Sequence, residues 1–148
     1  LLLGGHGDDM VPLPRYTSVH GIPVTQLLSA EKIDACVNRA KMGGGELVKL
    51  MGTSAYHAPA AGVIQMAEAV IKDKKRILPC AGYCELQYNV GSPGQGYFIG
   101  VPCVIGAGGV ERIIEIDLDQ QERALMNASI THVKELVELV ARLYPDLA

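Results

Sequence analysis

The sequence predicts an α+β fold in which an antiparallel β-meander packs with long helices. Two apolar, β-rich runs at residues 77–84 and 97–106 flank a polar loop with three glycines, a pattern typical of a hairpin. Apolar residues recur at helical spacing before these runs and again near the end of the chain. Because strand and helix patterns are segregated rather than alternating, α+β is favoured over a parallel α/β sheet.

The composition is that of an ordinary globular protein. The chain has 148 residues, enough for one domain, with 49% hydrophobic and 20% charged residues and a formal net charge of −3. The basic clusters at residues 39–41 and 72–76 are short, so we expect solvated helix ends and no nucleic-acid partner. No apolar run approaches the roughly 20 residues of a membrane span, so we expect no membrane partner.

Four cysteines show neither metal-ligand spacing nor a disulfide framework, and all but Cys84 lie in strongly apolar surroundings. They are Cys36, Cys80, Cys84 and Cys103. We therefore expect free, mostly buried thiols in a reducing compartment, and a soluble cytoplasmic protein.

The first informative stretch is residues 1–14, LLLGGHGDDMVPLP, in which His6 stands among three glycines after an apolar run that reads as the end of a buried strand. Imidazole exchanges a proton near neutral pH, and glycine allows a ligand to approach the backbone closely, so general acid/base chemistry is one interpretation. A hydrogen-bonded loop histidine is another. Metal ligation with Asp8 or Asp9 is a third, although no further ligand motif accompanies them.

Residues 10–24 hold three prolines that exclude a helix, so we predict one short strand within residues 15–20, an exposed His20, and a turn at residues 21–23. Ser29 is a candidate N-cap for an amphipathic helix over residues 29–42. The three glycines at 43–45 cost roughly 1 kcal/mol each relative to alanine, which predicts a break or a close approach there. Helix is expected again over residues 46–51, up to Gly52.

Residues 53–59 (TSAYHAP) precede a second apolar stripe over residues 60–72, and Pro59 fits the first position of that helix. Thr53 and Ser54 could donate hydrogen bonds at the edge of a pocket, or they could simply cap and turn the chain. We expect His57 at the surface or in an interface.

The glycine turn at residues 106–109 follows a strand, as in dinucleotide-binding motifs, but the alternation at residues 114–118 predicts another strand and hence a hairpin. A capping-box pattern at residues 119–122 then begins a long helix that ends before Pro145. We expect its apolar stripe to lie in the core. The stripe comprises Leu125, Met126, Ile130, Val133, Val137, Val140 and Tyr144.

Five segments together resemble the C-terminal, substrate-binding half of the NAD-dependent L-lactate/malate dehydrogenase family, and among its members look most like the lactate-dehydrogenase-like malate dehydrogenases. The resemblance covers essentially the whole chain, and its first segment is highly specific for the family. The segments are GGHGDDMVPL (4–13), GGGELVKL (43–50), TSAYHAPAAG (53–62), KDKKRILPC (72–80) and GVPCVIGAGGVERIIEI (100–116).

The resemblance implies an NAD-dependent malate dehydrogenase that interconverts malate and oxaloacetate, with L-lactate dehydrogenase as the alternative in the same family. His6 matches the family's proton donor and acceptor. Ser54 and Ala55 match positions that line the substrate pocket, and Pro59 matches a helix start near the nicotinamide. No metal is implied. The helix after Pro59 looks like one used in subunit contacts, which implies a homo-oligomer, a dimer or a tetramer.

The family's cofactor fingerprint, its carboxylate-binding arginine, its histidine-orienting aspartate and its mobile-loop arginine all belong upstream of residue 4, and none has a matching position here. The sequence also begins at Leu1 without a methionine. We therefore expect residues 1–148 to be the C-terminal catalytic domain of a two-domain enzyme, with the N-terminal dinucleotide-binding domain absent. NAD would be bound mainly by that missing half or a companion chain, and this chain alone would be inactive.

Two other classes of function are open. A non-catalytic interaction domain would use the apolar helix at residues 60–71. A hydrolase would use residues 4–7 as an oxyanion-binding loop, but the sequence has no G-x-S-x-G nucleophile elbow.

Overall fold

The computed structural model describes residues 1–147, apart from the side chains of Asp8 and Leu147. The strands are β1 (Leu2–Gly4), β2 (Met10–Pro12), β3 (Ser18–Val19), β4 (Ile22–Pro23), β5 (Arg76–Cys84), β6 (Tyr97–Gly106) and β7 (Gly109–Ile113). The helices are α1 (Val24–Leu27), α2 (Ala30–Met51), α3 (His57–Ile71) and α4 (Gln120–Leu143), with short 3₁₀ turns η1 (Gly7–Asp9), η2 (Pro14–Tyr16), η3 (Gln87–Asn89) and η4 (Pro145–Leu147). None of the described helices is both long and apolar enough to cross a membrane.

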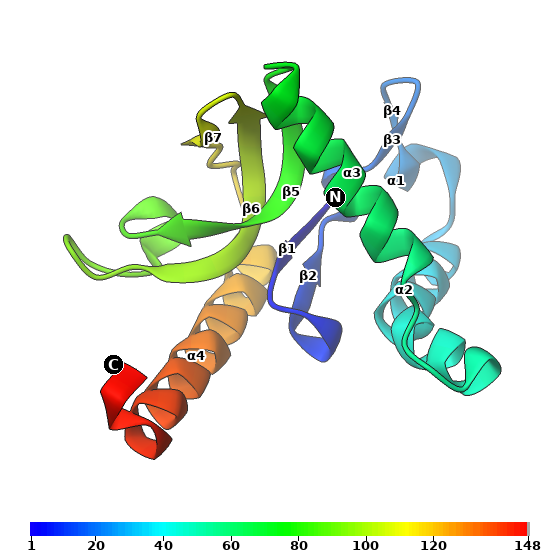
Figure 1. Cartoon of the computed structure of the whole chain (residues 1–148). Coiled ribbons are helices and arrows are strands. Elements are labelled where there is room, and N and C mark those ends of the chain that lie inside the picture. Colours follow the sequence, from blue (N-terminus) through cyan, green and yellow to red (C-terminus); the bar gives the residue numbers. More distant parts are fainter. Residues whose placement is uncertain (148) are drawn as a thin grey trace.

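An antiparallel sheet organises the fold, as predicted, and β6 is its central strand. β5 pairs with β6 along its whole length, from Arg76 opposite Ile105 to Cys84 opposite Tyr97. β7 pairs with the end of β6, and the β1–β2 hairpin joins the sheet through the pair Gly4 and Gly100. Figure 1 shows the long curved β5–β6 pair with the small β1–β2 hairpin beside it and α4 running away below. The first and third quarters of the chain therefore form one sheet.

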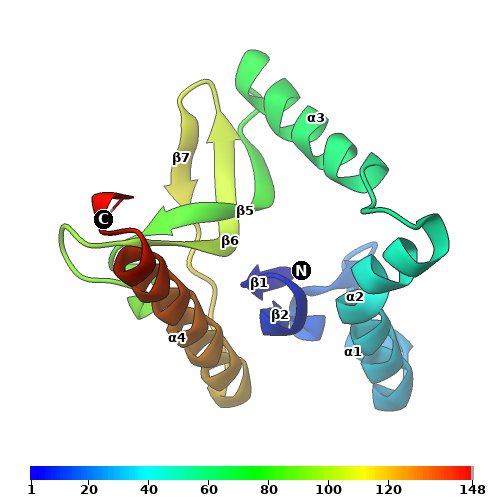
Figure 2. The same ribbon diagram turned by 60° about the horizontal axis from the view of Figure 1, so that its bottom comes forward.

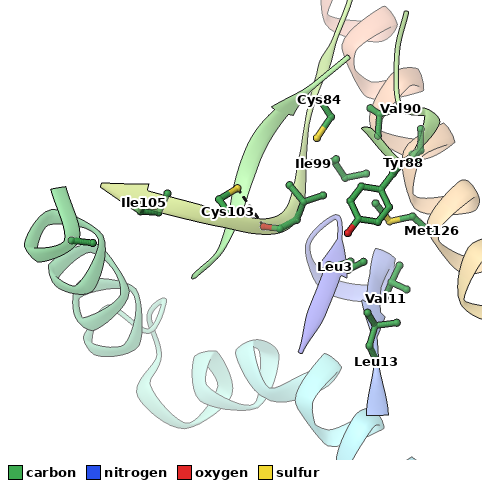
Figure 3. Close-up of a cluster of buried hydrophobic side chains, with 13 residues drawn as sticks. Leu3, Val11, Leu13, Cys84, Tyr88, Val90, Ile99, Cys103, Ile105 and Met126 are labelled. Carbon is green, nitrogen blue, oxygen red and sulfur yellow. Dashed lines mark hydrogen bonds between the residues drawn. The ribbon is translucent and has the colours of Figure 1, made fainter. Parts of the chain in front are cut away.

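The core lies where the hairpin, β6 and α4 meet (Figure 3). Alternate residues of β6 point into it, as the period-two pattern of a strand requires. Each such aliphatic side chain contributes roughly 1.5–3 kcal/mol when it is removed from water. The buried hydrophobic residues are Leu3, Val11, Leu13, Ala69, Cys84, Tyr88, Val90, Ile99, Val101, Cys103, Ile105, Met126 and Ile130.

Helix α4 begins with the predicted capping box. The Asp119 carboxylate accepts from the Glu122 N–H at 2.9 Å, and the Glu122 carboxylate accepts from the Asp119 N–H at 3.0 Å. Glu122 is buried and also accepts from Arg15 Nη2 at 2.7 Å, and this contact lowers the pKa of the Glu122 carboxyl. The beginning of α4 is thus tied to η2 near the start of the chain.

Only three residues of the predicted α4 stripe lie in the core or pack against it. Met126 and Ile130 are buried and Val133 packs against them, whereas Val137 and Val140 are exposed. The prediction that the whole stripe is core is therefore wrong for Leu125, which is 45% exposed, and for the second half of the stripe, where α4 extends beyond the sheet (Figure 1).

Helices α2 and α3 form an arm beside the sheet (Figure 2). No residue of α2 is buried, and Ala69 is the buried residue of α3. The predicted apolar stripe of α3 exists but is open, with Val63 64% and Ile64 67% exposed. The arm therefore presents apolar side chains to the outside of this chain.

The predicted break at residues 43–45 is wrong, because α2 runs through all three glycines. Nor is there a close approach within the described chain, since a Cβ at any of them would have open space around it. The helix has a cap at each end, namely the Ser29 side chain and Gly52 in the left-handed region at φ 71°. These caps and the good helix formers on both sides offset the roughly 1 kcal/mol cost of each glycine.

Two smaller predictions change position. Residues 22–23 are strand β4 rather than a turn, and the turn is at His20 and Gly21, which both have positive φ. The last strand is β7, and residues 114–118 belong to no strand, although the Ile114 N–H still donates to the Pro102 C=O of β6 at 2.8 Å. After that bond the strand ladder ends, and the Tyr88 hydroxyl donates to the Ile114 C=O and accepts from the Ile116 N–H.

Helix α3 begins at His57, so Pro59 is its third residue rather than its first. Proline is still tolerated there, because the first turn has no intrahelical partners for its N–H groups. The N-cap is Tyr56 with no side-chain cap, so the capping interpretation of Thr53 and Ser54 is wrong. His57 is exposed, as expected.

Candidate active site

His6 lies on the connection of the β1–β2 hairpin, between Gly5 and the 3₁₀ turn η1. β1 and β2 pair with Leu3 opposite Val11 and Gly4 opposite Met10, which fixes both ends of this loop. The His6 side chain is exposed. The hairpin therefore presents an imidazole at the edge of the sheet, as the glycine-rich sequence predicts.

The glycines of the loop serve different purposes. Gly4 has φ +83°, and a Cβ there would lie 2.7 Å from Ser129 Oγ and 2.9 Å from the Asp9 carbonyl oxygen. Gly7 has φ +69° but open space around it, so it supplies only the turn conformation. Gly4 is required for both close packing and backbone geometry, whereas Gly7 is required for backbone geometry alone.

Helix α4 is hydrogen-bonded to the His6 loop. Gly5 N–H donates to Ser129 Oγ at 2.7 Å, and the Ser129 hydroxyl donates to the Asp9 C=O at 2.9 Å. One turn further along, His132 Nε2 lies 3.4 Å from Asp9 Oδ2, with both side chains substantially exposed. Sequence reasoning missed Ser129, although a serine on the same helix face as Met126 and Ile130 is a detectable signal.

An open cavity of about 370 Å³ adjoins the imidazole. Its walls come from the hairpin and from the middle of β5 and β6, and they are mainly apolar. The lining residues are Leu2, Leu3, Gly4, Gly5, His6, Met10, Pro79, Cys80, Ala81 and Gly100. Burial raises the pKa of the Cys80 thiol, so it stays protonated near neutral pH. Among the lining side chains, imidazole is the one suited to proton exchange there.

The other predicted site residues lie elsewhere. Ser54 is exposed and Ala55 half-buried on the connection between α2 and α3, and Pro59 is exposed in the first turn of α3. None of the three lines the His6 cavity. The described chain does not bring them together with His6, so their roles in binding substrate and cofactor stay predictions.

The geometry bears on two other interpretations of the sequence, a metal site at His6 and a dinucleotide-binding turn at residues 106–109. Among the described residues, no three His, Cys, Asp or Glu side chains cluster as metal ligands, and the Asp8 side chain lies outside that description. The glycine turn at residues 106–109 joins the antiparallel strands β6 and β7, with Gly106 opposite Gly109. The hairpin prediction is therefore confirmed, and this turn does not open a phosphate-binding helix.

The four cysteines are free, as predicted, but their burial is only partly as expected. Cys84 and Cys103 are buried and Cys80 is intermediate, whereas Cys36 is exposed on α2. The apolar surroundings of Cys36 in the sequence form the open face of α2 rather than core.

Comparison with known proteins agrees with the family resemblance seen in the sequence. Residues 1–143 match the model of the lactate/malate dehydrogenase alpha/beta C-terminal domain. The chain is 56% identical over 138 residues to malate dehydrogenase 1 of Anaeromyxobacter dehalogenans, covering 93% of this chain and 43% of that protein. It is similar to the solved malate dehydrogenase of Salinibacter ruber, with TM-score 0.93 and 52% identity, over 100% of this chain and 47% of that one.

A lactate dehydrogenase from Eimeria maxima, solved with NADH and oxamate, is also similar, with TM-score 0.90 and 42% identity over 96% of this chain and 44% of that one. The chain thus spans less than half the length of the relatives it matches. Both the sequence match and the shared architecture cover nearly all of its residues. The chain belongs to the lactate/malate dehydrogenase family and corresponds to that family's alpha/beta C-terminal domain.

Proposed function

We propose that residues 1–148 are the C-terminal, catalytic half of an NAD-dependent malate dehydrogenase, which interconverts malate and oxaloacetate. The observation that carries this proposal is the exposed His6 imidazole beside an open cavity, on a loop held by the sheet and by α4. Relatives at 50–56% identity are named malate dehydrogenases, which favours malate over lactate.

The chemical role of His6 is proton transfer at the oxygen of the substrate. In the oxidising direction, the neutral imidazole accepts the proton of the 2-hydroxyl group while the C–H bond breaks and the hydride leaves. In the reducing direction, the imidazolium donates that proton to the carbonyl oxygen. A positioned acid/base of this kind contributes roughly 10²–10⁴-fold to the rate.

The residues present fit only one end of a nicotinamide cofactor. The open His6 cavity would border the nicotinamide ring, and the family resemblance alone assigns Pro59, in the first turn of α3, to the same ring. The described chain has no glycine-rich turn that opens a helix for the pyrophosphate. When bound, the nicotinamide supplies the hydride acceptor or donor. We assign most of its binding to an N-terminal domain or companion chain.

Substrate contacts and assembly complete the proposal. Ser54 would donate a hydrogen bond to the substrate, and Ala55 would contribute shape to the pocket. The open apolar face of α3, with Val63 and Ile64, supports a homo-oligomer, a dimer or a tetramer, because such faces are usually covered in the assembled protein. The free thiols fit a cytoplasmic location.

The test is to express the chain with the preceding half of the enzyme and to follow NADH oxidation with oxaloacetate and with pyruvate. The proposal predicts that oxaloacetate gives the larger kcat/KM and that residues 1–148 alone give no turnover. The similarity to a lactate dehydrogenase makes pyruvate the informative competitor. A preference for pyruvate would replace malate by lactate as the substrate.

A further inference from the structure

We propose that Ser129 on α4 is a positioning residue for His6, which holds both ends of the His6 loop at a fixed distance from the cavity. This inference rests on the proposed role of His6 as the acid/base. Ser129 itself does not touch the substrate or the reacting atoms in this scheme.

The two hydrogen bonds of Ser129 bracket His6. Gly5, immediately before His6, donates its N–H to Ser129 Oγ at 2.7 Å, and Asp9, at the end of η1, accepts from the Ser129 hydroxyl at 2.9 Å. Both bonds join residues more than a hundred positions apart in the chain. A single hydroxyl therefore fixes the two backbone points between which the imidazole stands.

Ser129 departs from what a helical hydroxyl usually does. Serine and threonine within helices commonly bond the carbonyl of the preceding turn, and Thr131 does so, donating to the Asn127 C=O at 3.0 Å. The Ser129 hydroxyl instead uses its donor and an acceptor lone pair on the loop. Thr131 is therefore a matched control on the same helix, with a hydroxyl that serves only the helix.

Burial and packing make this connection rigid. Ser129 is only 3% exposed, so water cannot readily replace either bond. A Cβ at Gly4 would lie 2.7 Å from Ser129 Oγ, and one at Gly5 would lie 3.4 Å from it. The glycines of the loop thus leave the space that the hydroxyl fills.

The consequence for catalysis follows from the sensitivity of proton transfer to distance. A displacement of about 1 Å at a catalytic group can cost on the order of 10²-fold in rate, even when substrate binding is little changed. Without Ser129, the pairs of β1 with β2 and with β6 still hold the outer ends of the hairpin, but the loop itself loses its contact with α4. The expected defect is in the chemical step.

The experiment compares Ser129→Ala, Ser129→Thr and the control Thr131→Ala in the two-domain enzyme. Ser129→Ala should lower kcat about ten- to hundred-fold and change KM for the oxo acid by less than about threefold. Hydrogen exchange at the Gly5 amide should become faster. Ser129→Thr, which keeps the hydroxyl, should restore most of kcat, and Thr131→Ala should behave as the parent enzyme.

The proposal is overturned if folded Ser129→Ala keeps kcat within about twofold of the parent, or if Thr131→Ala produces the same loss. It is also overturned if the loss of kcat only follows the fraction of unfolded protein in a thermal melt. Should Ser129→Ala not fold, Ser129→Cys takes its place with the same expectations, because it keeps the volume and weakens both bonds. His6→Asn separates the two claims. If it keeps turnover, the proposed acid/base role fails, whereas loss of turnover with an unaffected Ser129→Ala removes only the positioning role.

Discussion

Replacing Gly4 by alanine should destabilise the protein, because the added methyl group has no room and the backbone is in the left-handed region. The new Cβ would lie 2.7 Å from Ser129 Oγ and 2.9 Å from both the Asp9 carbonyl oxygen and Val11 Cγ2. Two of these neighbours, the Asp9 backbone and the buried Val11, are held by β2 and by the core. They cannot move aside at little cost.

The magnitude is the sum of two terms. A non-glycine residue at φ +83° costs about 1–2 kcal/mol. Forcing a methyl group into a packed site costs about 1–3 kcal/mol more. The total of about 2–5 kcal/mol corresponds to a fall in Tm of roughly 5–15 °C for a domain of this size.

Thermal unfolding followed by far-UV circular dichroism measures this effect, and Gly44→Ala is the matched control. Gly44 lies within α2 with open space around its Cα, so the same change there should raise the free energy of unfolding by about 0.5–1 kcal/mol. The same Gly→Ala substitution should therefore lower the free energy of unfolding at residue 4 and raise it at residue 44. An unchanged Tm for Gly4→Ala would refute the packing described for the His6 loop.

Two further predictions concern titration and thiol reactivity. Since Arg15 lowers the pKa of Glu122, the stability from this pair is fully present above the ordinary glutamate pKa of about 4.3 and is lost as the pH falls through the lower folded-state pKa. Glu122→Gln should therefore reduce stability near neutral pH and flatten the acid side of a pH–stability curve, and an unchanged acid limb would contradict this assignment. Exposed Cys36 should react with a thiol reagent in the native protein, whereas buried Cys84, whose pKa burial raises to about 11, should react only on unfolding. Mass spectrometry of the labelled peptides distinguishes them, and early labelling of Cys84 would count against the core arrangement.

The parts of the fold that the sequence predicts well are those decided by neighbouring residues. The apolar, β-rich run at residues 97–106 predicts β6, and the pattern at Asp119 and Glu122 predicts the capping box of α4, because strand propensity and helix caps depend on residues a few positions apart. The α+β class follows from the order of these local signals.

The failures have tertiary causes. Glycine propensity predicts a break at residues 43–45, but the caps and flanking residues keep α2 continuous. The period of residues 114–118 is that of a strand, yet after the bond from Ile114 N–H to Pro102 C=O the next hydrogen bonds, at Ile114 C=O and Ile116 N–H, go to the Tyr88 hydroxyl. Which apolar side chains are covered also depends on residues far away in the sequence, so the prediction of burial is wrong for Cys36, for Leu125 and for the second half of the α4 stripe.

In the candidate site, too, some residues can be identified from local sequence and others only from the fold. His6 and its glycines are contiguous, so the sequence identifies the loop directly. Ser129 and the cavity wall at Pro79 and Gly100 approach His6 only through the fold, and composition or spacing does not indicate which distant residues will meet there. Ser54 and Pro59 are predicted as site residues from the family resemblance alone, and neither lines the His6 cavity in the described chain.

The most direct measurement is kcat/KM for oxaloacetate reduction by His6→Asn in the two-domain enzyme, with His20→Asn as its control. His20 is an exposed histidine at the β3–β4 turn with φ 49°, a conformation that asparagine tolerates. We predict a loss of roughly 10²–10⁴-fold for His6→Asn and parent-like kinetics for His20→Asn. If His6→Asn keeps most of the turnover while remaining folded, His6 is not the proton donor and acceptor.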